Sequence, residues 1–429
     1  MTGRGLAGLA AELDGLLAEA DAELARRYPG DRPGRQPVHT VYVPADQYAP
    51  GLAERWGAQA LDLLGRHAPT PADFAEVMGV PPGEAAAVRD RVTAKLAAEP
   101  VEDLRLDFED GYGDRGAAVE AADARAAAGA LATDVAAGTA PPFCGLRCKS
   151  LEAGTRRRAL ATLDAFLAEL SGVGPLPAGF VITLPKVTSA DQVRAMTLAC
   201  ERLEAAHGLP PGRLRYEVQA ETAQLILGAD GTATVASCVR AGGARLTGLH
   251  YGTYDYSAGL GIAAAYQSME HPAADHARSV LQVAAAGTGV RLSDGSSNVL
   301  PSGSPAEIAA AWRLHARLVR RSLERGFYQG WDLHPGQLAS RYAATYAFFR
   351  AGLPAARERL AGYLRRVSSG TLEEPATARA LAGYLVRGLD CGAVSEDEVT
   401  GLAVLDRAAI TALAGPRRGA SGDAGDADG

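Results

Sequence analysis

The chain alternates between short runs rich in β-branched and other apolar residues and longer segments with apolar residues at helical spacing, and this alternation repeats eight times. Such alternation is typical of a parallel sheet, because each parallel connection needs a crossover that is usually a helix. Eight repeats predict that the sheet closes into a (β/α)8 TIM barrel, a fold of about 250 residues. The strand-like runs are residues 38–43, 104–108, 145–148, 180–184, 215–220, 246–251, 290–292 and 331–333.

An open, doubly wound sheet is the main alternative for this pattern. Sheets of that kind commonly carry a glycine-rich dinucleotide-binding turn after the first strand. The first run ends at Val43 and Pro44 without such a turn. The barrel is therefore the preferred prediction.

Segments outside the repeat predict how the rest of the chain is organised. Residues 1–37 are expected to form an N-terminal helix followed by a loop rich in Pro, Gly and Arg. The barrel is assigned to residues 38–352, including an insertion at 51–98 that is predicted to be helical and broken near its Pro-Pro pair. A helical subdomain is predicted for residues 353–415. The low-complexity tail, residues 416–429, is expected to be disordered.

Composition excludes several classes of protein. The 429 residues are 47% hydrophobic and 22% charged, which is ordinary for a globular chain with a large core. The net charge of −7 and the lack of a long basic run argue against a nucleic-acid partner. No stretch reaches the roughly 18 apolar residues of a membrane span, and Glu12, Asp14 and Glu19 are unlike a secretory signal. The five cysteines are spaced neither as a zinc site nor as a disulfide framework. We expect a cytoplasmic protein with no membrane partner.

Polar residues gather where the predicted strands end. In a barrel, chemistry takes place at the carboxyl ends of the strands, so these residues are the candidates for a functional site. Histidines in such positions are more often structural than catalytic, which applies to His250 and His334. The candidates in chain order are Asp107, Glu109, Asp110, Arg147, Lys186, Glu221, Asp255 and His334.

Glu221 and Asp255 form the predicted metal site. They follow adjacent strands and have no Cys or His cluster near them in the sequence, which favours a hard cation with oxygen ligands. Mg2+ fits best, and Mn2+ is the alternative ion. The structural alternative makes Glu221 an acid at a helix N-terminus and Asp255 a loop residue that caps a turn.

Arg147 and Lys186 supply positive charge at the same ends. The planar guanidinium of Arg147 suits a carboxylate or carbonyl of a substrate, and the alternative is a structural ion pair with Glu109 or Asp110. Lys186 could polarise a carbonyl or, if desolvated, form a Schiff base. Its alternative is a salt bridge to a neighbouring acid. At least one of the three acids Asp107, Glu109 and Asp110 is expected to orient Arg147 or to form a hydrogen bond with a metal-bound water.

Short segments at the predicted strand ends form a recognisable series. They are HTVYVPA at 39–45, LDFEDG at 106–111, GLR at 145–147, LPKV at 184–187, AETA at 220–223, GTYDY at 252–256, GF at 326–327 and GWDLHPGQ at 330–337. Together these segments resemble the citrate lyase beta-subunit/HpcH–HpaI aldolase family over about residues 38–340. The resemblance implies that Glu221 and Asp255 hold Mg2+ and that Arg147 contacts the substrate. It also implies a homo-oligomer, either a trimer or a dimer, and a small carboxylic acid or acyl-CoA substrate.

The chain also departs from that family. Gln219 and Ala220 replace the apolar residues usual before the metal glutamate, and the interval from Glu221 to Asp255 is longer than in the lyases. The substrate therefore cannot be carried over. Beside Arg147, we assign substrate binding to three residues near the strand ends, namely Gly252, Thr253 and His334.

A second similarity is to the malate synthase barrel. GLHYGTYDY at 248–256 resembles its sixth-strand motif, and LEEPATA at 372–378 resembles the segment with its catalytic aspartate. Glu374 would take the place of that aspartate. The alternative is a capping box that opens a helix over 374–388.

The resemblance implies a metal-dependent carbon–carbon lyase or aldolase that acts on a hydroxy acid, or its coenzyme A thioester, through a stabilised enolate. Glu374, Asp110, Glu109 and a metal-bound water are the candidates for the base. Three alternatives stay open: an acyl-condensing enzyme of malate synthase type, a Schiff-base aldolase that uses Lys186, and a non-catalytic metabolite-binding barrel.

Overall fold

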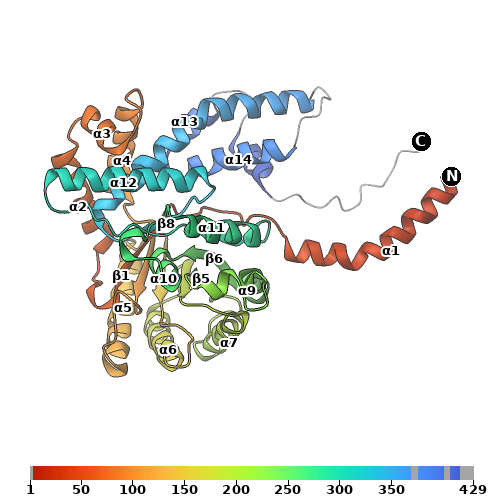
Figure 1. Ribbon diagram of the computed structural model, residues 1–429, viewed down its shortest axis with the longest axis horizontal. Helices are drawn as coiled ribbons and strands as arrows, with labels where there is room; N and C mark the ends of the chain where they lie inside the picture. The colour runs from red at the N-terminus through yellow and green to blue at the C-terminus, as the bar shows by residue number, and fades with distance from the viewer. Residues whose placement is uncertain (1–2, 369–374, 401–405, 416–429) are drawn as a thin grey trace.

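The computed structural model describes residues 3–368, 375–400 and 406–415, and its eight strands form one parallel sheet surrounded by helices (Figure 1). All eight predicted strands are present, and each observed end lies within two residues of the predicted one. The strands are β1 (His39–Pro44), β2 (Asp103–Asp107), β3 (Phe143–Arg147), β4 (Gly179–Leu184), β5 (Tyr216–Ala220), β6 (Leu246–Tyr251), β7 (Arg291–Ser293) and β8 (Gly330–Asp332).

The sheet closes into a barrel. Each strand from β1 to β7 pairs in parallel with the next, and β8 pairs with β1. A parallel bridge between Ser293 and Gln329 joins the two remaining edges, and Asp294 N donates a hydrogen bond to Gln329 O at 2.8 Å. The predicted barrel is confirmed, and the open-sheet alternative is wrong.

Helices cover the outside of the barrel, and their inner faces bury small and branched apolar side chains such as Ala124, Ala128 and Leu131 of the helix between β2 and β3. Two short helices, α8 (Ala223–Ile226) and α10 (Thr253–Gly259), follow β5 and β6 directly and were not predicted. The long outer helices are α5 (Ala117–Ala137), α6 (Arg156–Val173), α7 (Ala190–Ala206), α9 (Thr234–Gly242), α11 (Pro272–Ala285), α12 (Pro305–Glu324) and α13 (Pro335–Ser368).

The insertion at 51–98 forms three helices, α2 (Leu52–His67), α3 (Pro71–Met78) and α4 (Ala85–Ala98). The break near the Pro-Pro pair was predicted, but the break before α3 was not. There the Thr70 side chain accepts a hydrogen bond from Asp73 N, the Asp73 side chain bonds back to Thr70 N, and Pro71 occupies the first turn. This capping box ends one helix and begins another within an apolar pattern that looks continuous.

The boundary predicted between residues 352 and 353 falls within a single helix, α13. Pro354 lies inside this helix, where its missing N–H removes one backbone hydrogen bond. Leu338 and Tyr342 of α13 pack in the barrel's core, whereas Leu360 packs in a second, smaller cluster. That cluster includes α14 (Pro375–Asp390) and α16 (Arg407–Ala414), with α15 (Glu396–Thr400) between them in the chain. The predicted tail at 416–429 lies outside the described residues.

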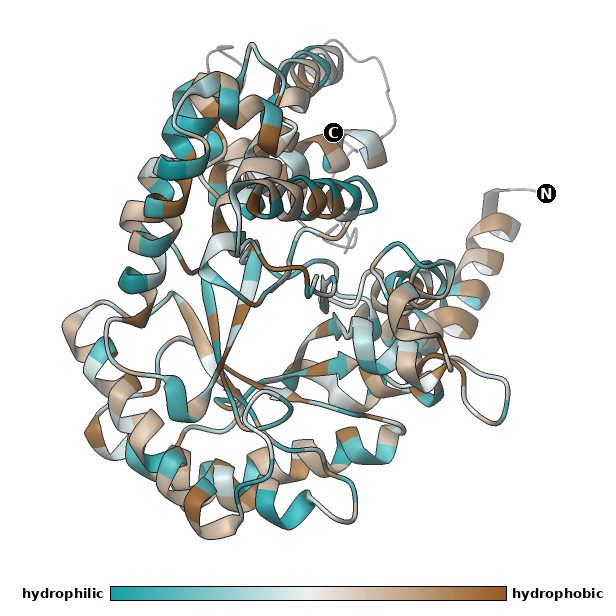
Figure 2. Ribbon diagram, turned by 60° about the vertical axis from the view of Figure 1, so that its left-hand side comes forward, coloured by the Kyte–Doolittle hydropathy of each residue, from teal (hydrophilic) through white to brown (hydrophobic). Residues whose placement is uncertain are grey.

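The N-terminal helix α1 (Gly3–Arg27) projects away from the barrel (Figure 1). Every residue from 5 to 22 is exposed, and Figure 2 shows apolar residues along this helix. Among the described helices, none has both the length and the apolar character needed to cross a membrane.

Candidate functional site

Lys186 lies at the centre of the polar cluster at the carboxyl ends of the strands. Its ammonium contacts three carboxylates, two from the loop after β2 and one from α10. The distances from Nζ are 2.7 Å to Glu109 Oε1, 3.1 Å to Asp110 Oδ2 and 2.8 Å to Asp255 Oδ2. Burial opposes the charge, but the surrounding carboxylates raise the pKa of Lys186 above its ordinary value. The salt bridge that the sequence offered as an alternative role for Lys186 is present, and the side chain is a cation.

The backbone of Lys186 is in the left-handed region, with φ of 52°, and it is alone in this among the non-glycine residues that the structure describes. That conformation costs about 1–2 kcal/mol for an L-residue, so its surroundings must hold it. Lys186 N donates a hydrogen bond to Glu221 Oε1 at 2.8 Å. The turn after β4 therefore directs the amide of Lys186 to one site carboxylate and its ammonium to the others.

Glu221 follows β5 directly and its carboxylate is buried, with the residue 3% exposed. Its Oε2 accepts a hydrogen bond from Gln219 Nε2. Burial raises the pKa of Glu221 to about 8 despite the opposing charges of Lys186 and Arg147. The nearby positive charges do not offset the cost of burying this carboxylate, so it is suited to bind a cation.

Gly252 lets the end of β6 lie against Glu221. Ala220 pairs with Tyr251 across β5 and β6, and Gly252 N donates to Ala220 O at 3.0 Å. A Cβ atom on Gly252 would lie 2.6 Å from Glu221 Cβ and 2.8 Å from its Oε2. The absence of a side chain is therefore required for α10 to begin here and to carry Asp255 in its first turn to the same end of the barrel.

The two carboxylates of Glu221 and Asp255 fit a hard divalent cation. The Asp255 side chain is 44% exposed and Glu221 is buried, so the pair combines an enclosed oxygen ligand with one that faces solvent. Mg2+ commonly takes one or two protein carboxylates and keeps water in its other positions. Within the described ranges, no three His, Cys, Asp or Glu side chains are grouped as metal ligands. The donor set thus matches a two-carboxylate site rather than a closed structural one.

Arg147 makes a bidentate ion pair with Asp107, at 2.6 Å from Nε and 2.7 Å from Nη2. Asp107 also accepts hydrogen bonds from the amides of Glu109 and Gly111, and the guanidinium lies 4.9 Å from the centre of the Tyr42 ring. The ion pair that the sequence offered as an alternative is therefore present with Glu109, but the bidentate partner of Arg147 is Asp107. Asp107 is the bidentate partner because it is directly beside Arg147 in the β2–β3 register.

One edge of the Arg147 guanidinium remains directed at the cluster. Nη1 lies 3.1 Å from Gln219 Oε1 and 3.5 Å from Glu109 Oε2. Since Asp107 holds the other two nitrogens, Nη1 is the group that could meet a substrate oxygen.

The remaining predicted residues have different surroundings. Thr253 is buried, and its Oγ1 donates to Ser296 O at 3.3 Å. His334 Nδ1 accepts a hydrogen bond from Gly336 N at 3.0 Å, which ties this nitrogen to the beginning of α13, and burial lowers the pKa of His334. Glu374 lies outside the described residues.

Sequence reasoning did not single out Tyr42 or Trp331 as site residues. Tyr42 stacks on Arg147, and its ring centre lies 4.6 Å from that of Trp331. Strand alternation could have found them, because side chains two apart on a barrel strand share the inner face. The same period places Gln219 beside Glu221, where it joins that carboxylate to Arg147.

Comparisons with known proteins agree with the fold. A model of the family described as a domain of unknown function (DUF6986) matches residues 17–418. A citrate lyase structure from Burkholderia xenovorans is 19% identical, with 88% of this chain and 97% of that chain covered and a TM-score of 0.57. The Haloferax volcanii malate synthase magnesium/glyoxylate complex is 15% identical, with 89% and 99% covered and a TM-score of 0.50. No curated protein sequence matches. At these identities the two structures show a shared fold and no more.

Proposed function

The chain belongs to the DUF6986 family, and from this premise we propose that it is a Mg2+-dependent carbon–carbon lyase or aldolase. Its substrate would be a small hydroxy acid or the coenzyme A thioester of one. The narrower relationship to the HpcH–HpaI aldolases is part of the same proposal. Mn2+ is the alternative ion.

The observation that carries the proposal is the meeting of two carboxylates, a guanidinium and an ammonium at the carboxyl ends of the strands. Glu221 and Asp255 would hold the metal, and Lys186 contacts both of them. The same barrel fold is found in the Haloferax malate synthase described in complex with magnesium and glyoxylate. That ligand is a small 2-oxo acid, which matches the charge and size of the predicted substrate.

The metal, when bound, would supply Lewis acidity to the carbonyl and carboxylate oxygens of the substrate. Arg147 would orient the substrate through Nη1, because Asp107 and Tyr42 fix the guanidinium plane. The Lys186 ammonium would stabilise negative charge that develops near the Asp255 carboxylate.

In cleavage, a base takes the proton of the substrate hydroxyl, the carbon–carbon bond breaks, and its electron pair remains on the carbon beside the acyl group. Glu109 suits this role better than Asp110. Burial raises the pKa of Glu109. Burial also opposes the charge of Asp110, but the hydrogen bond with Glu109 and the charges of Arg147 and Lys186 hold the pKa of Asp110 below its ordinary value. Condensation would use the same groups in reverse, as in an enzyme of malate synthase type.

A Schiff-base mechanism is less suited to this site. It needs a neutral amine on Lys186, and three carboxylates favour the ammonium instead. A non-catalytic barrel that binds a metabolite is the remaining alternative, and the experiment below separates it from an enzyme.

The test uses metal-stripped protein and a panel of hydroxy acids and their thioesters, with the reverse condensations, each with and without Mg2+. Glu221→Gln and Asp255→Asn are compared with Asp191→Asn, a change to an exposed acid on α7. We expect Mg2+-dependent turnover that only the first two changes abolish. Full activity without metal would contradict the proposal. Heat release on Mg2+ titration in the wild type and not in Glu221→Gln reports the metal site even if no panel member reacts, and metabolite binding without turnover would favour the non-catalytic barrel.

A further inference from the structure

The apolar face of α1 is uncovered within one copy of the chain. Its leucines recur at helical spacing and lie within a stripe of about 100° on the helix surface. Their side chains are between 44% and 75% exposed. An exposed apolar stripe of this length is uncommon on a monomeric protein and marks an interaction surface. The leucines are Leu6, Leu9, Leu13, Leu16, Leu17 and Leu24.

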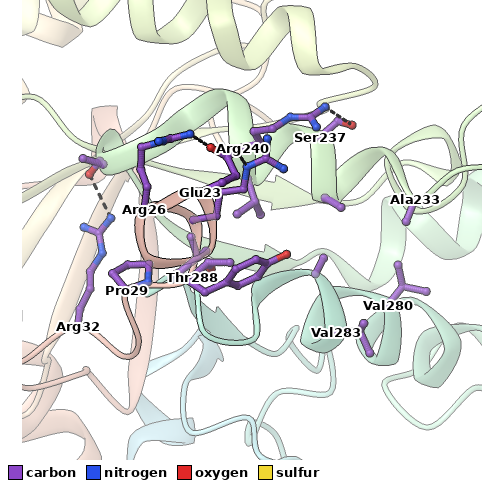
Figure 3. Close-up of a pocket in the computed structure, with 18 of the residues that line it drawn as sticks. Glu23, Arg26, Pro29, Arg32, Ala233, Ser237, Arg240, Val280, Val283 and Thr288 are labelled. Carbon is purple, nitrogen blue, oxygen red and sulfur yellow. Dashed lines mark hydrogen bonds and ion pairs between the residues drawn. The ribbon is translucent and has the colours of Figure 1, made fainter. Parts of the chain in front are cut away.

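An apolar groove lies on the body of the same chain, beside the end of α1. It encloses a cavity of about 1170 Å3 between α9, α11 and the last turn of α1. Figure 3 shows Val280 and Val283 on one side of this space, with Ala233 and Arg240 on the other. Val283 is 80% exposed, so the groove presents apolar surface to solvent as α1 does.

The charges of the two surfaces are complementary. The α1 helix has no basic residue between positions 5 and 25, and its acids flank the leucine stripe on both sides. The groove is lined by Glu23, which pairs with Arg26 and Arg27, and by two further arginines. Of these two, Arg32 contacts backbone carbonyls and Arg240 contacts Ser237 Oγ. Neither pairs with a carboxylate in the described part of the chain. The acids of the stripe's margins are Glu12, Asp14, Glu19 and Asp21.

From this match we propose that α1 of one copy docks into the groove between α9 and α11 of a second copy, and that the exchange is reciprocal. Because the groove begins where α1 leaves the body, two copies related by a two-fold axis can each extend a helix across the other. A helix of 25 residues is about 37 Å long, enough to span such a groove. Pairing of α1 with α1 is disfavoured, since it would bring two uniformly acidic segments together.

The first test is the mass of the full chain in solution, by light scattering and sedimentation over a range of concentrations. We expect a dimer that the double change Leu9→Glu/Leu16→Glu weakens by about 100-fold or more. Val283→Glu, in the groove, should act in the same direction. Ala11→Glu adds the same charge on the opposite face of α1 and is the matched control, expected to leave the dimer intact. Since these positions lie on the surface, circular dichroism should show unchanged folding.

Cross-linking identifies the surfaces that meet. All five native cysteines are buried, so introduced surface cysteines are the reactive ones. Leu13→Cys protein mixed with Val283→Cys protein should form a disulfide-linked pair of the two. A monomer at every concentration would overturn the proposal. So would a dimer unaffected by the leucine changes, or a strong Leu13→Cys self-linkage in which Val283→Cys takes no part, because that would show α1 pairing with α1.

Discussion

Gly252 offers the sharpest test of how the barrel positions its acidic site. In Gly252→Ala, the new Cβ would lie 2.6 Å from Glu221 Cβ, about 0.8 Å short of the 3.4 Å at which ordinary van der Waals contact begins. Glu221 Cβ is attached to the backbone directly after β5 and cannot rotate away. The backbone of Gly252, with φ of −100° and ψ of 105°, suits alanine, so the effect comes from the contact alone. Overpacking of this kind costs about 1–3 kcal/mol of stability.

A displaced Glu221 should also weaken function. Misplacement of a site group by about 1 Å can cost 100-fold in rate, so we expect Mg2+-dependent turnover to fall by roughly 10- to 100-fold. Gly248→Ala on β6, the strand that ends directly before Gly252, is the matched control, because its nearest contact would be an ordinary 3.5 Å. Urea denaturation and Mg2+ titration measure both effects. Equal Mg2+ affinity and stability in the two variants would refute the reasoning.

Three further predictions concern the surroundings of the site and the fold. Arg147→Lys loses the bidentate bond to Asp107 and the stacking on Tyr42, so urea denaturation should show a loss of about 2 kcal/mol, and substrate KM should rise. Burial alone would raise the pKa of Asp275, but three neighbouring arginines lower it to about 2. Because the folded pKa is below the unfolded value, this stabilisation is present above about pH 4 and is lost as the pH falls toward 2. The stability difference between wild type and Asp275→Asn should therefore shrink from about 2 kcal/mol to near zero over that interval, and a constant difference would contradict it. Finally, a chromogenic disulfide reagent should find almost no reactive thiol in the native protein and five after unfolding, since every cysteine is buried and burial raises each pKa to about 12.

The barrel could be predicted because its signal is local and repeated. Each strand is a short apolar run, and each crossover helix has its own periodicity. The break before α3 was missed because the helical pattern of apolar residues continues on both sides of it. The capping box of Thr70 and Asp73 begins a new helix within that pattern. The length of α13 was missed because Pro354 normally predicts an interruption, yet packing on both sides of it maintains the helix.

The site could be predicted in part. The positions of Lys186, Glu221 and Asp255 at strand ends follow from the strand order, and the structure brings these residues together. The bidentate partner of Arg147 could not be chosen from spacing, because Asp107, Glu109 and Asp110 lie within four residues of one another and only the register of β2 and β3 decides among them. The left-handed turn at Lys186 has no sequence signal, since glycine is the residue that usually marks one.

The continuity of α13 has a consequence for how this protein unfolds. One helix contributes Leu338 and Tyr342 to the barrel and Leu360 to the C-terminal cluster. The two cores therefore share a rigid helix instead of a flexible connection. If one core unfolds, α13 loses part of its packing, and the other core depends on the same helix. Calorimetry should show a single cooperative transition whose enthalpy includes both cores. A change in the C-terminal cluster, far along the chain from the strand ends, should then lower the melting temperature of the whole barrel.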